Sequence, residues 1–417
     1  MPRSRLLFVT REPIVHQLGG STTYALNLLR LLAAHSGQVT VVATVAESRS
    51  PRLFFRAKAP LPEGVHLIVP GFVRLGGLYL QLHSLRAWGR AVLRAAVRWR
   101  WLRPVAGFVS KLYGDTLTGV AWDLSEPTAA ERALVLRSTA STDATTVIGN
   151  YSYFGKIFDA PSMRTLHRVL IMHDFLSLRV ERFLTAGLPL DCTHLTREQE
   201  IGWLNNATCV LAAQQTEAAE VQPSVKARVL VPPMVWTTHR SEGPPQPFRL
   251  LFVGSNIVPN RTGLHWFLSE VWPLVRARHP AATLAVCGAI GSSLATIPEG
   301  VGVLGLVPHL DAEYGKAAVV LVPLQVGTGI KIKLLEALSF GKAIVSTSTG
   351  VQGVEDLVAG VVEVADDPQP FADAIHRLLD DPALRQTREE AALAFVERHF
   401  GSRQELPPEF AAGVLGE

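Results

Sequence analysis

Residues Val326 to Ser346 read VGTGIKIKLLEALSFGKAIVS, and this stretch decides the fold. The pattern predicts a glycine loop, a short helix from near Ile330 to Gly341, and then a strand. Gly327 and Gly329 let the backbone approach a ligand without a Cβ atom in the way. Because the first N–H groups of a helix are free and lie at its positive dipole end, the loop predicts an anion site.

Three charged side chains accompany this loop. Lys331 and Lys333 add mobile positive charge beside the helix start, and Glu336 inside the helix can accept hydrogen bonds from hydroxyls. A cationic loop with a carboxylate suits a ligand that carries both phosphates and a sugar ring, such as a nucleotide sugar. Alternatively, Lys333 and Glu336 are three residues apart and form a surface pair of small energetic value. Spacing alone leaves both interpretations open.

Apolar segments on both sides of the stretch alternate between strand and helix patterns, which is typical of a parallel, doubly wound sheet. In the first half we expect a helix over 21–34, with Ser21 as its N-cap, and strands at 5–9, 39–45, 65–69, 145–149, 168–172, 207–212 and 228–231. The proline-rich residues 241–247 predict a linker. After the linker the alternation of strand and helix patterns begins again. We expect strands at 249–253, 283–287, 301–304, 318–322, 342–346 and 360–364 and helices at 262–278, 370–379 and 386–399.

The Glu336-Ala337-Leu338 helix that ends in Gly341-Lys-Ala-Ile-Val345 resembles the donor-binding segment of glycosyltransferase family 4. The resemblance implies an α/β protein of the GT-B fold, with two doubly wound, Rossmann-like domains facing a central cleft. Residues 1–240 would form the acceptor-side domain and 241–247 the linker. Residues 248–385 would form the nucleotide-sugar domain, and 386–417 a helical segment that returns to the first domain.

The resemblance also implies roles for the donor-binding residues. Glu336 would bind the ribose hydroxyls, while Gly329, Ile330 and Lys331, assisted by Lys333, would hold the diphosphate. Thr328 stands where the family usually has an acidic residue that contacts the sugar. Near the start of the chain, Gly19 and Gly20 match a Gly-Gly loop near the diphosphate and the acceptor. In the second half, Asn260 and Arg261 would replace the arginine that usually grips the diphosphate.

His173 and Asp174 follow the strand expected at 168–172, and the carboxyl end of a parallel strand is where ligands bind. An imidazole there can donate to a substrate hydroxyl or stabilise charge. The alternative is a buried histidine satisfied by a backbone carbonyl. In the family, the corresponding histidine contacts the sugar near the reacting carbon, so we expect His173 and Asp174 to be catalytic. Arg179 is either a phosphate ligand or a helix surface charge, and Asn150 is expected to line the cleft.

Bulk composition excludes several other classes of protein. The 417 residues carry a net charge of only +4, which argues against nucleic-acid binding. No apolar run is long enough to span a membrane, and the N-terminus has no export signal, so we expect a cytoplasmic protein. Its three widely spaced cysteines fit reduced thiols better than a disulfide framework or a zinc site.

Residues 82–103 predict a helix with a stripe of arginines at 86, 90, 94 and 98 and an apolar stripe that includes Trp88 and Trp99. Such a helix can lie on an anionic membrane, which would place the protein peripherally on the inner membrane face. Alternatively, its apolar face packs on the sheet and its arginines face water. The two interpretations stay open.

Together these features predict a retaining, metal-independent glycosyltransferase of the hexosyltransferase type. It would move a sugar from a UDP- or GDP-linked donor to a hydroxyl of a glycan, a lipid-linked sugar or a small molecule, with no cofactor. The alternatives are a nucleotide-sugar epimerase or phosphorylase on a related fold, and a catalytically silent, membrane-associated partner protein. The last is favoured by Thr328 in place of the usual acid.

Overall fold

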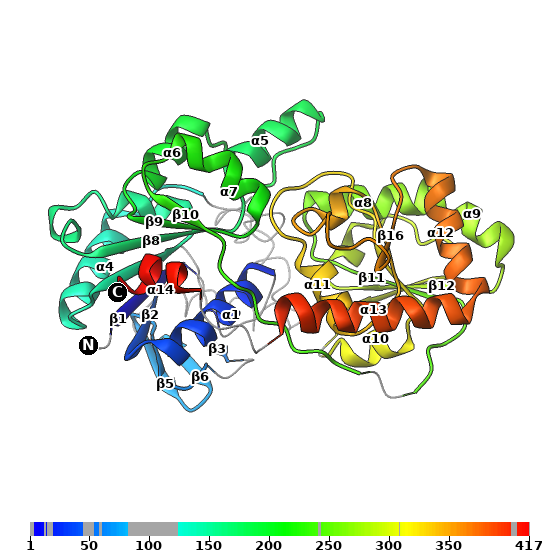
Figure 1. Cartoon of the computed structure of the whole chain (residues 1–417), viewed down its shortest axis with the longest axis horizontal. Helices are drawn as coiled ribbons and strands as arrows, with labels where there is room; N and C mark the ends of the chain where they lie inside the picture. Colours follow the sequence, from blue (N-terminus) through cyan, green and yellow to red (C-terminus); the bar gives the residue numbers. More distant parts are fainter. Residues whose placement is uncertain are drawn as a thin grey trace, which may run out of the picture.

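The computed structural model describes residues 4–11, 14, 20–44, 54–57, 61–81, 124–240, 243–307, 309–401 and 407–416. It contains two parallel sheets with helices packed around them, side by side in Figure 1. Two expectations from the sequence, Gly19 and the helix over 82–103, lie outside the described residues.

The first sheet has seven strands in the order β10-β9-β8-β7-β1-β2-β4, and every neighbouring pair is parallel. In that order the strands span Arg228–Leu230, Cys209–Ala212, His167–Met172, Thr146–Asn150, Arg5–Thr10, Gln38–Ala43 and Val65–Ile68. In β1, Leu6 and Phe8 pack into one apolar cluster while Leu7 and Val9 pack into another. Burial on both faces explains why the strand is a continuous apolar run in the sequence.

The second sheet has six parallel strands in the order β13-β12-β11-β14-β15-β16. They span Val301–Gly305, Thr283–Cys287, Arg249–Val253, Val319–Val322, Ile344–Ser346 and Val362–Val364. Here too the central strand is buried on both faces, since Leu251 packs into one cluster and Leu250 and Phe252 into another. The predicted class, two doubly wound α/β domains, is therefore confirmed.

Helices connect the strands of both sheets. The first domain has α1 (Gly20–His35), α4 (Ala129–Ser141), α5 (Leu176–Thr185), α6 (Arg197–Leu204) and α7 (Gln215–Val221). The second has α8 (Val258–Trp266), α9 (Trp272–Arg278), α10 (Asp311–Lys316), α11 (Ile332–Ser339), α12 (Pro368–Asp380) and α13 (Pro382–Phe400). Because α1 begins at Gly20, the expected N-cap Ser21 lies inside the helix, and that expectation is wrong.

Two further elements differ from the expectation. The helix expected over 262–278 begins at Val258 and is interrupted by a π-helical turn, Phe267–Val271, just before Pro273, which lacks a backbone N–H. A small antiparallel sheet of β3 (Phe54–Arg56), β6 (Leu78–Gln81) and β5 (Phe72–Leu75) was not expected. Its strands are only three or four residues long, too short to give a clear sequence pattern.

The end of the chain connects the two domains. Helix α13 packs against α11 and α12 of the second domain. The last helix, α14 (Pro408–Leu415), lies on the first domain, where Gly413 accepts a hydrogen-bond contact from the His167 ring (Figure 1). A single apolar cluster also joins the domains, because it contains residues of α1 and of α11. The loops after the strands of both sheets are thereby held close to each other.

Candidate functional site

The loop of the second domain that precedes α11 follows the central strand β14 and contacts the first domain directly. Gly329 has φ +69°, and a Cβ there would lie 1.9 Å from Asp174 Oδ1 and 2.8 Å from the carbonyl oxygen of His173. Only glycine fits this backbone and this contact. The sequence predicted that the backbone at Gly329 comes close to a ligand. In the structure it comes close to another segment of the same chain, the loop after β8.

Two helix starts meet beside this loop. Gly20, the first residue of α1, lies against Ile332, the first residue of α11, and a Cβ on Gly20 would be 2.9 Å from Ile332 Cγ1. Both helices direct the positive ends of their dipoles toward this junction, a combination that favours a bound anion. Ile330, which the sequence assigned to the diphosphate site, packs with Ile332 against the shared apolar cluster.

Lys331 is buried under the glycine loop. Its Nζ donates to the carbonyl oxygens of Thr328 at 3.0 Å and Gly329 at 2.7 Å and to Gln352 Oε1 at 3.2 Å. Burial lowers the pKa of Lys331 to about 8, and the nearby carboxylates of Asp174 and Glu217 oppose that shift. The ammonium group thus holds the loop in shape and supplies positive charge directly beneath it.

Lys333 lies on the opposite side of the helix start. Its ammonium group donates to Asn260 Oδ1 and sits 4.9 Å from the ring centre of Phe252. Burial lowers the pKa of Lys333 to about 7, and the charge of Lys331 adds to this effect. These partners, rather than a surface pair with Glu336, hold its side chain.

Glu336 is oriented by a residue that the sequence did not single out. The hydroxyl of Tyr314 in α10 donates to Glu336 Oε2 at 3.1 Å, and the Tyr314 ring stacks on Phe340 with centroids 4.4 Å apart. Burial raises the pKa of Glu336, while Tyr314 and Lys333 oppose the rise. A carboxylate held in this way keeps Oε1 available to accept a hydrogen bond from a ligand hydroxyl.

Arg261 is not in the loop where we expected it. It belongs to the first turn of α8, and its Nη1 donates to Asn256 Oδ1 at 3.0 Å and to the Asn256 carbonyl at 3.3 Å. The guanidinium group therefore fixes the loop after β11. Neighbouring Asn260 is buried and links Lys333 to Ser255, whose carbonyl accepts from Asn260 Nδ2 at 2.8 Å.

In the first domain, side chains at the carboxyl ends of three neighbouring strands form a chain of hydrogen bonds. Asn150 Nδ2 donates to Thr10 Oγ1 at 3.2 Å, and Asn150 Oδ1 lies 2.7 Å from His173 Nε2. The imidazole packs between Tyr24 and Tyr151, with ring centroids 5.1 and 4.5 Å away. Burial lowers the pKa of His173 to about 3, so the imidazole is neutral at physiological pH. A neutral imidazole can exchange hydrogen bonds with a substrate without carrying charge.

Asp174 belongs to a buried charge cluster. Its Oδ2 is 3.6 Å from Arg179 Nη1, and Arg179 also forms two hydrogen bonds with Asp191, at 3.1 and 2.6 Å. Burial raises the pKa of Asp174, with Arg179 and Lys331 acting in the opposite direction. Arg179 is thus committed to carboxylates of its own domain, which argues against the phosphate-binding alternative.

Two buried glutamates, Glu217 and Glu200, were not predicted from the sequence. Glu217 of α7 accepts a hydrogen bond from Gly329 N at 2.7 Å, and Glu200 of α6 accepts from Ser177 N at 2.7 Å. Burial raises the pKa of each to about 7. Neither belongs to a motif; the one available signal for Glu217 is that it follows closely after the strand β9.

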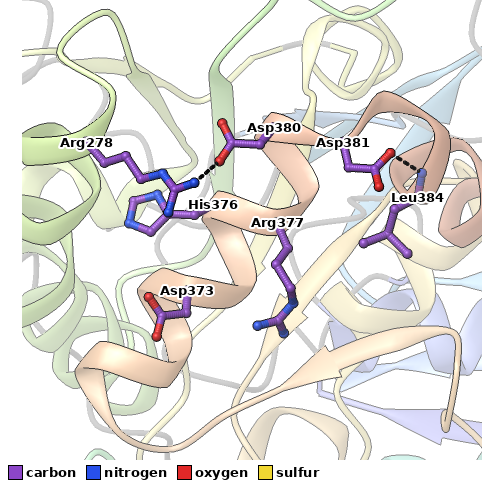
Figure 2. Close-up of a pocket in the computed structure, with 7 residues that line it drawn as sticks. All are labelled: Arg278, Asp373, His376, Arg377, Asp380, Asp381 and Leu384. Carbon is purple, nitrogen blue, oxygen red and sulfur yellow. Dashed lines mark hydrogen bonds and ion pairs between the residues drawn. The ribbon is translucent and has the colours of Figure 1, made fainter.

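A surface hollow of the second domain lies between α9 and α12 (Figure 2). Two of its arginines form ion pairs: Arg278 contacts Asp380 at 2.6 Å, and Arg377 contacts Glu363, outside the lining, at 2.8 Å. It contains none of the residues that the sequence predicted for the site. Its lining is Arg278, Asp373, His376, Arg377, Asp380, Asp381 and Leu384.

The described residues hold no group of three or more histidine, cysteine or carboxylate side chains arranged to bind a metal ion. Within that same part of the chain, no helix combines the length and the apolar character needed to cross a membrane. The three cysteines, Cys192, Cys209 and Cys287, are buried free thiols.

Comparison with known proteins agrees with this architecture. Residues 247–381 match the family model described as glycosyl transferases group 1. A curated relative, an uncharacterized 44.6 kDa protein in the cps region of Klebsiella pneumoniae, is 26% identical over 168 residues. That match covers 37% of this chain and 43% of the relative.

Solved structures match over nearly the whole chain. Sucrose-phosphate synthase from Thermosynechococcus elongatus has a TM-score of 0.64 at 14% identity and covers 96% of this chain and 95% of its own. Alr3699/HepE from Anabaena, in complex with UDP-glucose, has a TM-score of 0.60 at 14% identity, with 95% of each chain covered. WaaG, a glycosyltransferase involved in lipopolysaccharide biosynthesis, has a TM-score of 0.58 at 15% identity and covers 99% and 100%. The chain is thus a GT-B protein whose residues 247–381 match the glycosyl transferases group 1 family.

Proposed function

We propose that this protein is a retaining glycosyltransferase that moves a sugar from a nucleotide-sugar donor to an acceptor hydroxyl. The observation that carries the proposal is the Glu336 carboxylate, oriented by Tyr314, on the helix whose N-terminus meets that of α1. A carboxylate for ribose hydroxyls and two positive helix ends for a diphosphate are the parts that a nucleotide sugar requires.

The donor would lie along α11 and the loop before it. Glu336 would accept hydrogen bonds from the ribose, and the starts of α11 and α1 would face the diphosphate. Lys331 and Lys333 would stabilise the charge that develops on the leaving diphosphate, an electrostatic role that needs no metal ion. Both lysines are already fixed by hydrogen bonds, so little reorganisation would be needed.

The transferred sugar and the acceptor would face the first domain. His173, held by Asn150, would hydrogen-bond to the sugar near the reacting carbon, and Asp174 lies directly against Gly329 of the donor loop. The HepE structure with UDP-glucose supports a UDP-linked hexose as the first donor to test. The involvement of WaaG in lipopolysaccharide biosynthesis and the cps-region relative support glycan biosynthesis as the setting, with a lipid-linked or glycan acceptor.

The test is a panel of UDP- and GDP-sugars, with binding measured by calorimetry and nucleotide release measured with and without candidate acceptors. We expect one donor to bind, and to bind more weakly to Glu336→Gln. The control is Glu397→Gln, which changes an exposed glutamate of α13 and should leave donor binding unchanged. Retention would be read from the anomeric configuration of the product by NMR. Absence of binding to every nucleotide sugar would refute the proposal.

The same panel separates the alternatives. Isomerisation of the donor without an acceptor would indicate an epimerase, and binding without turnover would indicate a silent partner, the alternative that Thr328 favours. Peripheral membrane association, proposed from residues 82–103, is tested by binding to anionic vesicles, which should weaken as salt increases.

A further inference from the structure

The N-terminus of α5, directly after His173 and Asp174, is capped from outside its own segment. Phe175 at the N-cap provides no side-chain hydrogen bond. Instead, Glu217 Oε2 accepts from Phe175 N at 3.1 Å, and Glu200 accepts from Leu176 N at 3.2 Å and from Ser177 N at 2.7 Å. Two carboxylates from α7 and α6 therefore satisfy helix-start amides that would otherwise be buried without partners.

Glu217 differs from Glu200 because its second oxygen reaches the other domain. Oε1 accepts from Gly329 N at 2.7 Å, so one carboxylate joins the start of α5 to the glycine loop. The residue is only 2% exposed, and water cannot easily take the place of either bond. A hydrogen bond to a carboxyl oxygen in such a buried position is costly to break, because the amide left behind has no partner.

A second contact ties the same loop to α5. Arg182 Nη1 donates to the carbonyl oxygen of Gly327 at 3.1 Å. Close packing of Gly329 on Asp174 then fixes the distance between the two segments. The glycine loop is therefore held to the first domain by a carboxylate at its amide and a guanidinium at its carbonyl.

We propose that Glu217 is an interdomain positioning residue: its carboxylate locks the 327–329 loop onto the segment that carries His173 and Asp174. The contact joins residues of this chain alone, so the inference does not depend on the proposed function. It makes the relative position of the two halves of the site depend on this side chain, in addition to the Arg182 contact and the packing of Gly329 on Asp174.

The test is amide hydrogen exchange of the ligand-free full-length protein, followed in peptides that cover residues 326–331. In Glu217→Gln the amide group can no longer accept on both oxygens, so we expect exchange in these peptides to be about tenfold faster. The matched control is Glu200→Gln, which changes the same helix cap at a residue whose hydrogen bonds, among the described residues, all lie within the first domain. There we expect faster exchange at the start of α5 and unchanged exchange at 326–331.

A second variant covers the case in which Glu217→Gln does not fold. Arg182→Met leaves the cap of α5 intact and removes only the contact with Gly327, so it should also accelerate exchange at 326–331. Unchanged exchange of the loop in both Glu217→Gln and Arg182→Met would overturn the proposal. Equal acceleration of the loop in Glu200→Gln would overturn it as well, since the effect would then come from α5 alone.

Discussion

Tyr314 donates its hydroxyl to Glu336 Oε2 at 3.1 Å, and this bond crosses from α10 to the helix that follows the glycine loop. Burial raises the pKa of Tyr314 well above its usual value, so the phenol remains a donor at every physiological pH. The bond engages Oε2 of Glu336 and fixes the orientation of the carboxylate. In the proposed function, Oε1 would then accept a hydrogen bond from the donor.

Replacing Tyr314 by Phe should weaken donor binding without unfolding the protein. The ring still stacks on Phe340, but Glu336 loses the bond that orients it. We expect the Kd for the nucleotide sugar to rise roughly tenfold, the equivalent of about 1.4 kcal/mol. Calorimetry gives the Kd, and thermal unfolding shows whether the fold is intact; an unchanged Kd would mean that the bond has no part in binding.

Replacing Glu336 by Gln should have a larger effect, because it removes the charge that strengthens hydrogen bonds to hydroxyls. We expect donor affinity to fall roughly 10- to 100-fold, or about 1.4–2.8 kcal/mol. Free ribose 5-phosphate can serve as a competing probe of the same subsite. If Glu336→Gln and Glu397→Gln bind the donor equally well, Glu336 is not a ligand.

His173 should remain uncharged over the whole physiological pH range, because its pKa is about 3 through burial. His173 Nε2 lies 2.7 Å from Asn150 Oδ1. Replacing Asn150 by Asp would put a negative charge there, which should raise the pKa of His173 by roughly one to three pH units. NMR titration of the imidazole protons measures both values. A wild-type His173 that titrates near 6.5 would contradict the burial seen here.

Much of the fold was predictable because buried parallel strands leave continuous apolar runs. The strands Arg249–Val253 and Thr283–Cys287 have the expected bounds, and β1 ends one residue later than expected. The small sheet of β3, β5 and β6 was not predictable, because pairing of such short strands depends on contacts distant in sequence. Helix starts were the least accurate, as α8 shows, because Pro259 and Asn260 look like loop residues.

The site was predictable only in part, for a physical reason. Local pattern predicted a site at Glu336, Lys331 and Gly329, since glycines and charges at a helix start have a chemical meaning on their own. It gave no sign that Lys331 binds loop carbonyls or that Glu217 binds the Gly329 amide. The Lys331 partners are carbonyl oxygens of its own loop, and they become partners only through the folded shape of that loop. Glu217 comes from the other domain, so only the folded chain brings it to the Gly329 amide.

Glu200 predicts a specific dependence of stability on pH. Burial raises its pKa to about 7 from an ordinary 4.5, against the opposing hydrogen bonds of Ser177, Ser152 and Leu176. The folded protein therefore binds this proton more tightly than the unfolded chain, so the stabilisation is complete below about 4.5 and is lost as pH rises through about 7. Relative to Glu200→Gln, the free energy of unfolding of the wild type should fall by up to about 3 kcal/mol between those two pH values. Urea unfolding at several pH values measures this; a constant difference would contradict it.

Alanine substitutions at Gly329 and Gly305 would separate two effects on the free energy of unfolding: loss of the contact between the domains and backbone strain. Both have left-handed φ angles, +69° and +65°, but a Cβ on Gly305 would meet nothing within 4 Å, whereas one on Gly329 would meet Asp174 Oδ1 at 1.9 Å. Gly305→Ala should therefore cost only the backbone term of about 1–2 kcal/mol. Gly329→Ala should cost more, and it should also accelerate amide exchange in α5, because the loop can no longer seat against the first domain. Chemical unfolding and hydrogen exchange of the two variants, measured in parallel, test this. Equal losses of stability with no change in α5 would show that the loop does not press on Asp174 in solution.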